Sequence, residues 1–474
     1  MMTLSEILPW VEKGQLYGDG DTEFFGVSTD SRSITAGDLF VAIKGDKFDG
    51  NQYLDEAKRA GAAAAISNVN LNEYSIAGIQ VMDTKIALGQ IAKSWRARLS
   101  LPLIAVTGSN GKTTVTQMVA SILRAYKKDK AVATKGNFNN DIGVPKTLFQ
   151  LSKHTEIGVV EMGMNHPGEI AYLSSIAQPT IALVNNAQRE HMEFMGSVLA
   201  VAKENGSVLS ALPNDGIAVF PSDDEFSNLW LSMSQSRRVV MFAIHGETVT
   251  QKSAVEHIHC ITYEWIDNKW SVSVQTPKGL VSYHLHVAGL HNLKNSLAAI
   301  ACTYAAGVPR EFIEQGLQNF KSVAGRLQIM QLDMQGKNIV LVDDTYNANP
   351  DSMKEAVNVL ATMPGYRLLV LGDMGEVGND GEKFHQELGE YIHSKPIDCI
   401  FTIGKLSIHV SSPYGNAQHF HTIDKLKETI LEKIESLSGS VSILVKGSRF
   451  MKMERIVESI LNCDVISKEH ADAS

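Results

Sequence analysis

The 474-residue sequence has few cysteines, no excess of basic charge and no long apolar run. Its 4 cysteines stand far apart without a CxxC pair, which argues against a thiolate zinc site and against a disulfide framework. With 43 Lys and Arg against 52 Asp and Glu, the surface is not built to neutralise nucleic-acid phosphate. No stretch reaches the roughly 18 apolar residues of a membrane helix, and no secretory signal pattern opens the chain. We therefore expect a cytoplasmic protein with no nucleic-acid partner and no membrane segment.

The length suggests about three domains of 100 to 200 residues each. Residues 1–84 read as a small mixed domain with short strands and few long helices. Residues 85–323 show the apolar runs of a buried parallel sheet, with alternating, antiparallel-type strands between about 255 and 288. In residues 324–474, four strands alternate with four helices, which predicts a doubly wound, Rossmann-like domain. The predicted fold class is α/β with three domains.

A phosphate-binding loop is predicted where the apolar strand Leu101–Val106 meets a helical pattern. The connecting residues are Gly108, Ser109, Asn110, Gly111, Lys112, Thr113 and Thr114. Backbone N–H groups at such a turn can wrap a polyphosphate, while Lys112 reaches the β and γ oxygens and the Thr113 hydroxyl binds Mg²⁺. The first glycine of the usual Walker spacing is replaced by Val106, and an ordinary glycine-rich turn is the alternative interpretation.

Two side chains near the ends of the next strands are candidates for a metal site. Glu161 ends one predicted strand and could complete a Mg²⁺ shell with Thr113, although a solvated strand-end glutamate is common. His191 follows the next strand, but neutral imidazole is not a favoured Mg²⁺ ligand. From the sequence alone, Lys203 is an ordinary helix-surface lysine that no sequence rule selects.

Taken together, these pieces resemble the Mur ligases, the ATP-dependent amide ligases of bacterial cell-wall precursor synthesis. The matching segments are TGSNGKTT (107–114), EMG (161–163), His191, AGLHNLKNSLAA (288–299), GR (325–326) and DDTYNANPDSM (343–353). Further segments resemble the member of the family that adds a dipeptide: GDLFVAIKGDKFDGNQY (37–53), GNFNNDIGVP (136–145), VLGDMGEVG (370–378) and LVKGSR (444–449).

The resemblance implies that D-alanyl-D-alanine is joined to UDP-N-acetylmuramoyl-tripeptide through an acyl phosphate, with ATP and Mg²⁺ as cofactors. It implies catalytic roles for Lys112, Glu161, His191, Lys203 and Arg326. Thr113 and Glu161 would bind the ATP-linked Mg²⁺, and His191 a second one. Lys203 matches a position that many members carbamylate, which would turn it into a metal ligand. His291, Asn292, Asn295, Arg326 and Asp344 would contact ATP.

The resemblance also implies two groups of substrate contacts. Those for the UDP precursor are Ser28, Thr29, Asp30, Ser31, Arg32, Lys44, Asn137, Asn139 and Asn140. Those for the dipeptide are Asn347, Asn349, Lys446, Ser448 and Arg449. From the residues alone, each group also fits an ordinary turn, a helix cap or a solvated basic loop.

Three rival functions stay open at this stage: another ligase of the superfamily, a phosphate-loop switch or motor, and a non-catalytic nucleotide-binding module. We expect a monomer whose C-terminal domain swings near 323–326 to deliver the amine.

Overall fold

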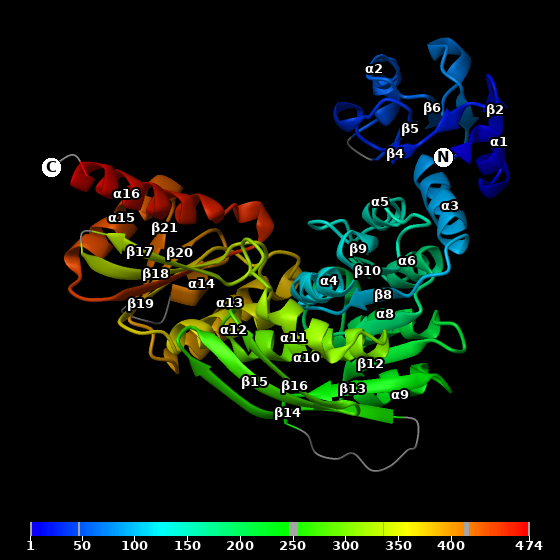
Figure 1. Cartoon of the computed structure of the whole chain (residues 1–474). Coiled ribbons are helices and arrows are strands. Elements are labelled where there is room, and N and C mark those ends of the chain that lie inside the picture. Colours follow the sequence, from blue (N-terminus) through cyan, green and yellow to red (C-terminus); the bar gives the residue numbers. More distant parts are fainter. Residues whose placement is uncertain (1, 46–47, 246–254, 335, 412–416, 473–474) are drawn as a thin grey trace.

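The computed structural model describes residues 2–45, 48–245, 255–334, 336–411 and 417–472. Three large sheets, each with its own helices, confirm the predicted α/β class (Figure 1). In Figure 1 the N-terminal sheet lies at the upper right in blue, the central sheet below it in cyan and green, and the C-terminal sheet at the left in yellow to red. The central part therefore stands between the two ends of the chain.

The N-terminal sheet has five short strands, four of them parallel. Its order is β2 (Gln15–Tyr17), β7 (Gly78–Gln80), β6 (Ala64–Ser67), β5 (Asp38–Val41) and β4 (Gly26–Ser28). A small separate pair joins β1 (Met2–Thr3) to β3 (Glu23–Phe24), beside the short helix α1 (Leu4–Ile7). The short helix α2 (Leu54–Arg59) comes between β5 and β6 in the chain. Helix α3 (Thr84–Ala97) leads from this sheet into the central one (Figure 1).

The central sheet has nine strands and changes character along its width. Strands β9 to β14 pair in parallel, and β14, β15 and β16 pair antiparallel, as the alternating pattern after residue 255 predicted. Its order is β16 (Gly279–Leu285), β15 (Lys269–Thr276), β14 (Val255–Ile266), β13 (Arg238–Ala243), β12 (Ile217–Pro221), β11 (Ile181–Val184), β8 (Leu103–Thr107), β10 (Ile157–Glu161) and β9 (Ala131–Ala133). Helices cover both faces, which is why β8, β10 and β11 are buried throughout and apolar except for Thr107 and Glu161 at the ends of β8 and β10.

The two faces of the central sheet are covered by different sets of helices. One face carries α4 (Lys112–Lys127), α10 (Leu290–Ala305) and α11 (Arg310–Gln318). The other carries α5 (Gly143–Leu148), α6 (Glu169–Ala177), α8 (Val198–Ser210) and α9 (Ser227–Met233). Helix α10 begins directly after Gly289, whose φ of 92° ends the extended chain.

The C-terminal sheet contains the four predicted strands and two more. Its order is β17 (Gln328–Met334), β18 (Lys337–Asp344), β22 (Val441–Lys446), β19 (Tyr366–Leu371), β20 (Cys399–Ile403) and β21 (Ala417–Phe420). Only β17 is antiparallel, as a hairpin with β18. Helices α12 (Pro350–Ala361) and α13 (Gly381–His393) cover one face; α15 (Ile423–Ser436) and α16 (Glu454–Asp472) cover the other. A short helix, α14 (Ile408–Ser411), follows β20.

The carboxyl ends of β8, β10 and β11 face those of β18 and β22 across one cavity of about 1990 Å³. Open parallel sheets bind their ligands at this edge, and the volume exceeds the usual ~300 to 1,000 Å³ of a single-ligand pocket. Among the residues that the structure describes, no helix combines the length and the hydropathy needed to cross a lipid bilayer.

Candidate active site

The loop between β8 and α4 has the backbone geometry of a phosphate cradle. Gly108 and Gly111 adopt φ values of 131° and 81°, which side chains other than glycine rarely allow. Space is also restricted at Gly111, because a Cβ there would lie 2.4 Å from Asn295 Oδ1. The loop residues from Ser109 to Thr114 line the large cavity, with their N–H groups at the start of a sixteen-residue helix.

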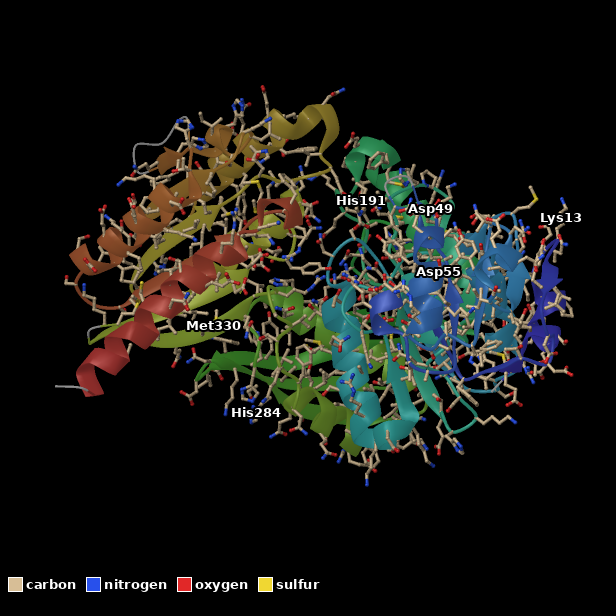
Figure 2. The ribbon with its side chains drawn as sticks, turned by 90° about the horizontal axis from the view of Figure 1, so that it is seen from above. Lys13, Asp49, Asp55, His191, His284 and Met330 are labelled. Atoms are coloured by element: carbon tan, nitrogen blue, oxygen red, sulfur yellow. The ribbon has the colours of Figure 1, made fainter. Side chains whose placement is uncertain are left out.

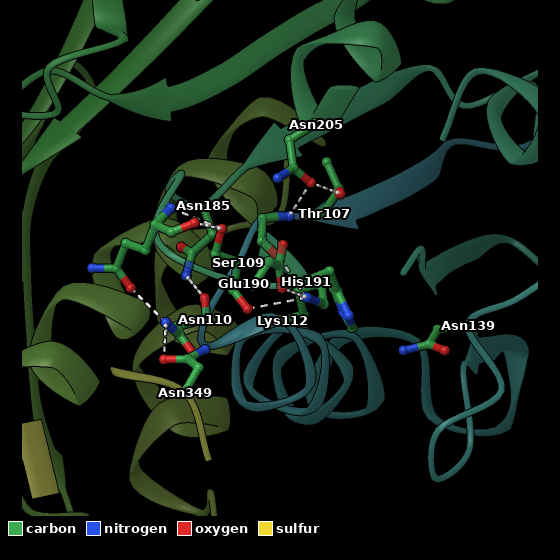
Figure 3. A network of polar contacts seen from close by, with 12 residues as sticks. Thr107, Ser109, Asn110, Lys112, Asn139, Asn185, Glu190, His191, Asn205 and Asn349 are labelled. Carbon is green, nitrogen blue, oxygen red and sulfur yellow. Dashed lines mark hydrogen bonds and ion pairs between the residues drawn. The ribbon is translucent and has the colours of Figure 1, made fainter. Parts of the chain in front are cut away.

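Lys112 is folded back onto this loop. Its Nζ donates to the carbonyl oxygens of Gly108, at 2.5 Å, and Ser109, at 3.1 Å. It also lies 3.1 Å from Oε2 of Glu190, a residue that the sequence analysis did not single out (Figure 3). The side chain of Glu190 is only 6% exposed, so Lys112 rests in a shielded ion pair at the place where phosphate would bind.

A run of amides after β11 fixes the shape of the loop. The N–H of Asn110 donates to Asn186 Oδ1 at 2.8 Å, and the N–H of Gln188 donates to Ser109 Oγ at 2.8 Å. Asn185 Nδ2 donates to the carbonyl of Asn110 at 2.8 Å. The segment Asn185-Asn186-Ala187-Gln188 carries a readable signal, three amides directly after a buried strand, although the sequence alone does not show what they hold.

Glu161 and Thr113 come together as the sequence predicted, and Asn139 joins them. Thr113 Oγ1 donates to Glu161 Oε1 at 3.0 Å, and Asn139 Nδ2 donates to the same oxygen at 2.8 Å. The second oxygen, Oε2, is buried and has no hydrogen-bond partner among the described residues. An orphaned carboxylate oxygen beside a threonine hydroxyl is a set of donors that fits Mg²⁺. Still, no group of three or more His, Cys, Asp or Glu side chains is gathered for a metal anywhere in the described part of the chain.

His191 sits at the boundary between the central and C-terminal sheets, as Figure 2 shows from above. It adopts φ 48° just before the short helix α7 (Met192–Met195). Its Nδ1 lies 2.6 Å from Oε2 of Glu376, which belongs to the loop after β19. The nearby His191 ring lowers the pKa of the Glu376 carboxyl, although Nδ1 lies outside hydrogen-bond geometry. His191 thus lines the cavity, and its ring contacts Glu376 of the C-terminal domain.

The structure does not bring Lys203 to this site. Lys203 lies on an exposed face of α8 and is not among the residues that line the cavity. The residue of α8 that reaches the phosphate loop is Asn205, which is 1% exposed. Its Oδ1 accepts hydrogen bonds from Thr107 Oγ1, at 2.5 Å, and from the N–H of Gly108, at 3.0 Å (Figure 3).

The residues expected to contact ATP line the same cavity, and each already contacts a neighbouring group of the protein. Asn295 Nδ2 donates to Asn292 Oδ1 at 3.1 Å, and Asn292 Nδ2 donates to the carbonyl of Ala288, just before the helix, at 2.8 Å. The His291 ring lies 3.3 Å from Glu355 of α12 and lowers the pKa of that carboxyl through their hydrogen bond. The guanidinium of Arg326 lies over the Tyr346 ring, 4.2 Å from its centroid.

Asp344, predicted to contact ATP, and Lys446, predicted to contact the dipeptide, form a buried ion pair. Lys446 Nζ, on the last residue of β22, lies 2.6 Å from Oδ2 of Asp344, on the last residue of β18. It also donates to the carbonyl of Asn347 at 2.8 Å. Ser448 is buried beside them, accepting from the N–H of Gly375 at 2.6 Å. All four of Asp344, Asn347, Lys446 and Ser448 line the cavity.

Asn349 and Arg449 make the contacts of a helix cap and of a solvated basic loop, which are the alternatives given above. Asn349 caps α12 by accepting from the N–H of Ser352, at 2.8 Å, ahead of Pro350. The same side chain also donates to Asn110 Oδ1 at 2.9 Å, so the cap touches the phosphate loop. Arg449 is exposed and pairs with Glu454 at 3.0 Å, although part of it lines the cavity.

The predicted UDP contacts form a separate group in the N-terminal domain. Ser28, Thr29, Asp30, Ser31, Arg32 and Lys44 do not line the large cavity. The Arg32 guanidinium hydrogen-bonds Asp30 at 2.7 Å and holds the pKa of that carboxyl at about 2. Lys44 Nζ lies 3.6 Å from Asp49 Oδ2. These contacts are those of an ordered turn followed by a strand end.

Asn137 and Asn140 lie with Asn139 on the cavity wall. Asn140 Oδ1 accepts from the N–H of Gly143, the first residue of α5, at 2.9 Å. In the C-terminal domain, Asp373 is buried and accepts from three successive N–H groups after β20, those of residues 405 to 407. His385 is also buried and accepts from the N–H of Met374 at 3.1 Å, which is a structural role.

Three family models match the chain in sequence order. One described as "Mur ligase family, catalytic domain" matches residues 23–96, "Mur ligase middle domain" matches 106–303, and "Mur ligase, glutamate ligase domain" matches 325–449. Together they span the three sheets.

Curated relatives and solved structures agree with these matches. The UDP-N-acetylmuramoyl-tripeptide--D-alanyl-D-alanine ligase of Escherichia coli K12 is 39% identical over 97% of this chain and 98% of its own length. That of Bacillus subtilis 168 is 34% identical over 93% and 94%. A crystal structure of MurF from Acinetobacter baumannii has a TM-score of 0.84 and 32% identity over 92% of this chain and 93% of its own. The Thermotoga maritima MurF ligase in complex with ADP has a TM-score of 0.80 and 25% identity over 96% and 99%.

Proposed function

The chain belongs to the Mur ligase family, and we propose from its site and its relatives that it joins D-alanyl-D-alanine to UDP-N-acetylmuramoyl-tripeptide. It is an ATP-dependent ligase of peptidoglycan precursor synthesis, with ADP and phosphate as the other products. The relatives that carry this name match nearly the whole chain, including the C-terminal domain that would receive the dipeptide.

One observation carries the proposal: Lys112 of the phosphate loop and Lys446 of the C-terminal domain line a single cavity. A nucleotide switch needs the first of these alone. A ligase needs both, because an activated carboxyl group must meet an amine delivered from elsewhere. The Asn110–Asn349 hydrogen bonds place the phosphate loop directly against the C-terminal domain.

The reaction follows from the poor leaving ability of carboxylate oxygen. The tripeptide carboxylate attacks the γ-phosphorus of ATP, the bond to the β–γ bridging oxygen breaks, and ADP leaves. The free amine of the dipeptide then attacks the acyl carbon of the acyl phosphate and loses a proton. The C–O bond breaks, and inorganic phosphate leaves with one oxygen of the original carboxylate. Two anions meet in the first step, so the positive charges of Lys112 and Arg326 lower its barrier.

Mg²⁺ fits Thr113 and Glu161, because Glu161 keeps one buried oxygen without a partner. When bound there, it would neutralise charge on the phosphate oxygens. His191 is proposed for a second metal contact near the acyl phosphate. We leave Lys203 out of the metal site, since it is exposed on α8 and does not line the cavity.

The remaining assignments extend the same proposal. His291, Asn292, Asn295 and Asp344 surround the adenosine, and Asn347, Asn349, Lys446, Ser448 and Arg449 receive the dipeptide. Asn137, Asn139 and Asn140 contact the sugar or peptide of the precursor, and the Ser28–Arg32 turn with Lys44 receives its UDP. We propose domains at 1–84, 85–323 and 324–474, a monomeric state, and a cytoplasmic location, where ATP is supplied.

Phosphate release from MgATP tests the function directly. We expect release only when UDP-N-acetylmuramoyl-tripeptide and D-alanyl-D-alanine are both present, with single D- or L-amino acids and glutamate with folate as the comparison acceptors. Turnover that needs no acceptor would favour a nucleotide switch or motor. Turnover with glutamate and folate would favour a different ligase of the superfamily.

A further inference from the structure

Glu190 is a buried carboxylate in the site that the reaction described above does not use. It lines the cavity and precedes His191, on the loop that follows β11. Oε2 contacts Lys112 Nζ at 3.1 Å. Oε1 is buried and has no hydrogen-bond partner within the described ranges of the chain. Half of this carboxylate is therefore unsatisfied even before a substrate arrives, a situation that native structures rarely leave without a purpose.

Glu190 cannot move far from the phosphate loop. Its N–H donates to the carbonyl of Gln188 at 2.9 Å, and Gln188 is itself tied to Ser109 by two hydrogen bonds. On its other side, His191 is held by Glu376 of the C-terminal domain. The carboxylate thus stays beside the place where the β- and γ-phosphates must lie, whatever Lys112 does.

Nucleotide binding changes the charges around Glu190. Lys112 can contact the phosphates only by sharing or leaving its contact with Glu190 Oε2, since its Nζ is now turned to that oxygen and to two loop carbonyls. A buried carboxylate would then face a polyanion, and such a pair is unfavourable unless a cation lies between the two. Carboxylate oxygens are the ligands that Mg²⁺ prefers.

We propose that Glu190 holds Lys112 in the nucleotide-free enzyme and exchanges it for a divalent cation when phosphates bind. This inference rests on the proposed ATP and Mg²⁺ dependence of the function. The side chain then serves twice: as a stand-in anion that keeps Lys112 in place, and as a metal contact on the His191 side of the phosphates.

Manganese binding tests the exchange without measuring activity. Electron paramagnetic resonance would count Mn²⁺ bound in the presence of a non-hydrolysable ATP analogue in the wild type, Glu190→Gln, Glu190→Asp and Glu193→Gln. Glu193 is exposed and lies three residues further along the chain. Because Glu193→Gln removes the same charge as Glu190→Gln, it is the matched control. We expect Glu190→Gln to weaken the Mn²⁺ site by about tenfold or more, Glu190→Asp to recover part of it, and Glu193→Gln to match the wild type.

ADP affinity in EDTA tests the other half of the exchange. Without metal, Glu190→Gln should bind ADP several-fold more tightly than the wild type, because no carboxylate competes for Lys112 or repels the phosphates. Unchanged Mn²⁺ affinity in Glu190→Gln would overturn the cation role, and weaker ADP binding in EDTA would overturn the stand-in role. Absence of nucleotide binding by the wild type would contradict the proposed function itself, which separates the two failures. Melting temperatures of all four proteins identify a variant that fails to fold.

Discussion

Arg189 donates to both carboxylate oxygens of Asp351, at 2.7 Å and 3.3 Å, across the boundary between the central and C-terminal domains. Its other terminal nitrogen donates to Glu387 of α13 at 2.9 Å. Asp351 lies in the first turn of α12, next to the Asn349 cap that touches the phosphate loop. This one arginine therefore aligns the loop carrying Glu190 and His191 with the domain that receives the dipeptide.

Replacing Arg189 by alanine should impair the second half of the reaction more than nucleotide binding. We expect kcat to fall about tenfold, equivalent to roughly 1.4 kcal/mol. The reason is that the reacting groups are less well aligned when the two domains are misplaced. The KM for ATP should change little. Arg238→Ala is the matched control, since its ion pair with Glu256 joins two strands inside the central sheet. Equal losses in both variants would show that the Arg189 contact has no special role in alignment.

Glu161→Gln tests the proposed Mg²⁺ site. The amide keeps the size of the side chain but removes the charge of the oxygens near Thr113 and Asn139. We expect Mg²⁺ affinity to fall by on the order of 100-fold, measured by titrating turnover with Mg²⁺. Glu156→Gln, whose ion pairs with Lys127 and Lys130 lie on the surface, should leave the titration unchanged. A normal Mg²⁺ titration in Glu161→Gln would place the metal elsewhere.

Lys203→Ala tests whether Lys203 acts at the metal site, as the resemblance implies, or is only an exposed residue of α8. Because Lys203 is exposed on α8, we expect activity within about twofold of the wild type, in line with other surface substitutions. Added bicarbonate should have no effect on either protein. A loss of more than tenfold that depends on bicarbonate would show instead that Lys203 is carbamylated and reaches the metal.

Gly111→Ala should damage the phosphate cradle through space as well as backbone strain. Its new Cβ would meet Asn295 Oδ1 at 2.4 Å and Asn185 Nδ2 at 2.7 Å. Gly136 also has a positive φ, 58°, but no atom lies within 4 Å of its would-be Cβ, so Gly136→Ala carries the strain alone. We expect both to lose about 1 to 3 kcal/mol of stability. Only Gly111→Ala should also lose ADP affinity, measured by calorimetry, and equal ADP affinities would contradict the account.

Asp224→Asn tests the electrostatics of the cavity wall near Lys294. Burial raises the pKa of the Asp224 carboxyl, so the folded protein binds its proton more tightly than the unfolded chain does. The stability contributed by this group is therefore greatest at low pH and falls as pH rises from the unfolded value of about 3.9 toward the folded one. At pH 7 the variant should melt at a higher temperature than the wild type, and the gap should narrow toward pH 4.

The neighbouring Asp223 supplies the control for that experiment. It is exposed and pairs with Lys294 at 2.6 Å, so Asp223→Asn should not raise the melting temperature at pH 7. A lower melting temperature for Asp224→Asn at pH 7 would show that its charge is stabilising.

The contiguous parts of the site were predictable from the sequence and the long-range parts were not. The phosphate loop is one segment between a buried strand and a helix, and the structure forms that turn. Arg189 and Asp351 are 162 residues apart, and no local pattern links them. The pairing of Lys446 with Asp344 depends on β18 and β22 being neighbours, which strand order alone reveals.

Helical register explains the difference between Lys203 and Asn205. Two residues along an α-helix correspond to a rotation of about 200°, so one of the pair faces the phosphate loop and the other faces solvent. The sequence motif does not fix this rotation, because α8 is apolar on more than one side. The antiparallel strand β17 was not predicted either, because its alternating residues match no parallel-strand pattern.

The most direct test of the central claim follows one oxygen atom through the reaction. UDP-N-acetylmuramoyl-tripeptide with oxygen-18 in its reacting carboxylate would be turned over with MgATP and D-alanyl-D-alanine, and the released phosphate analysed by mass spectrometry. The account predicts one oxygen-18 atom in each phosphate, because the carboxylate oxygen attacks the γ-phosphorus and leaves with it. Phosphate that carries no label would mean that water attacks ATP, and it would contradict the assignment of this chain as a ligase acting through an acyl phosphate.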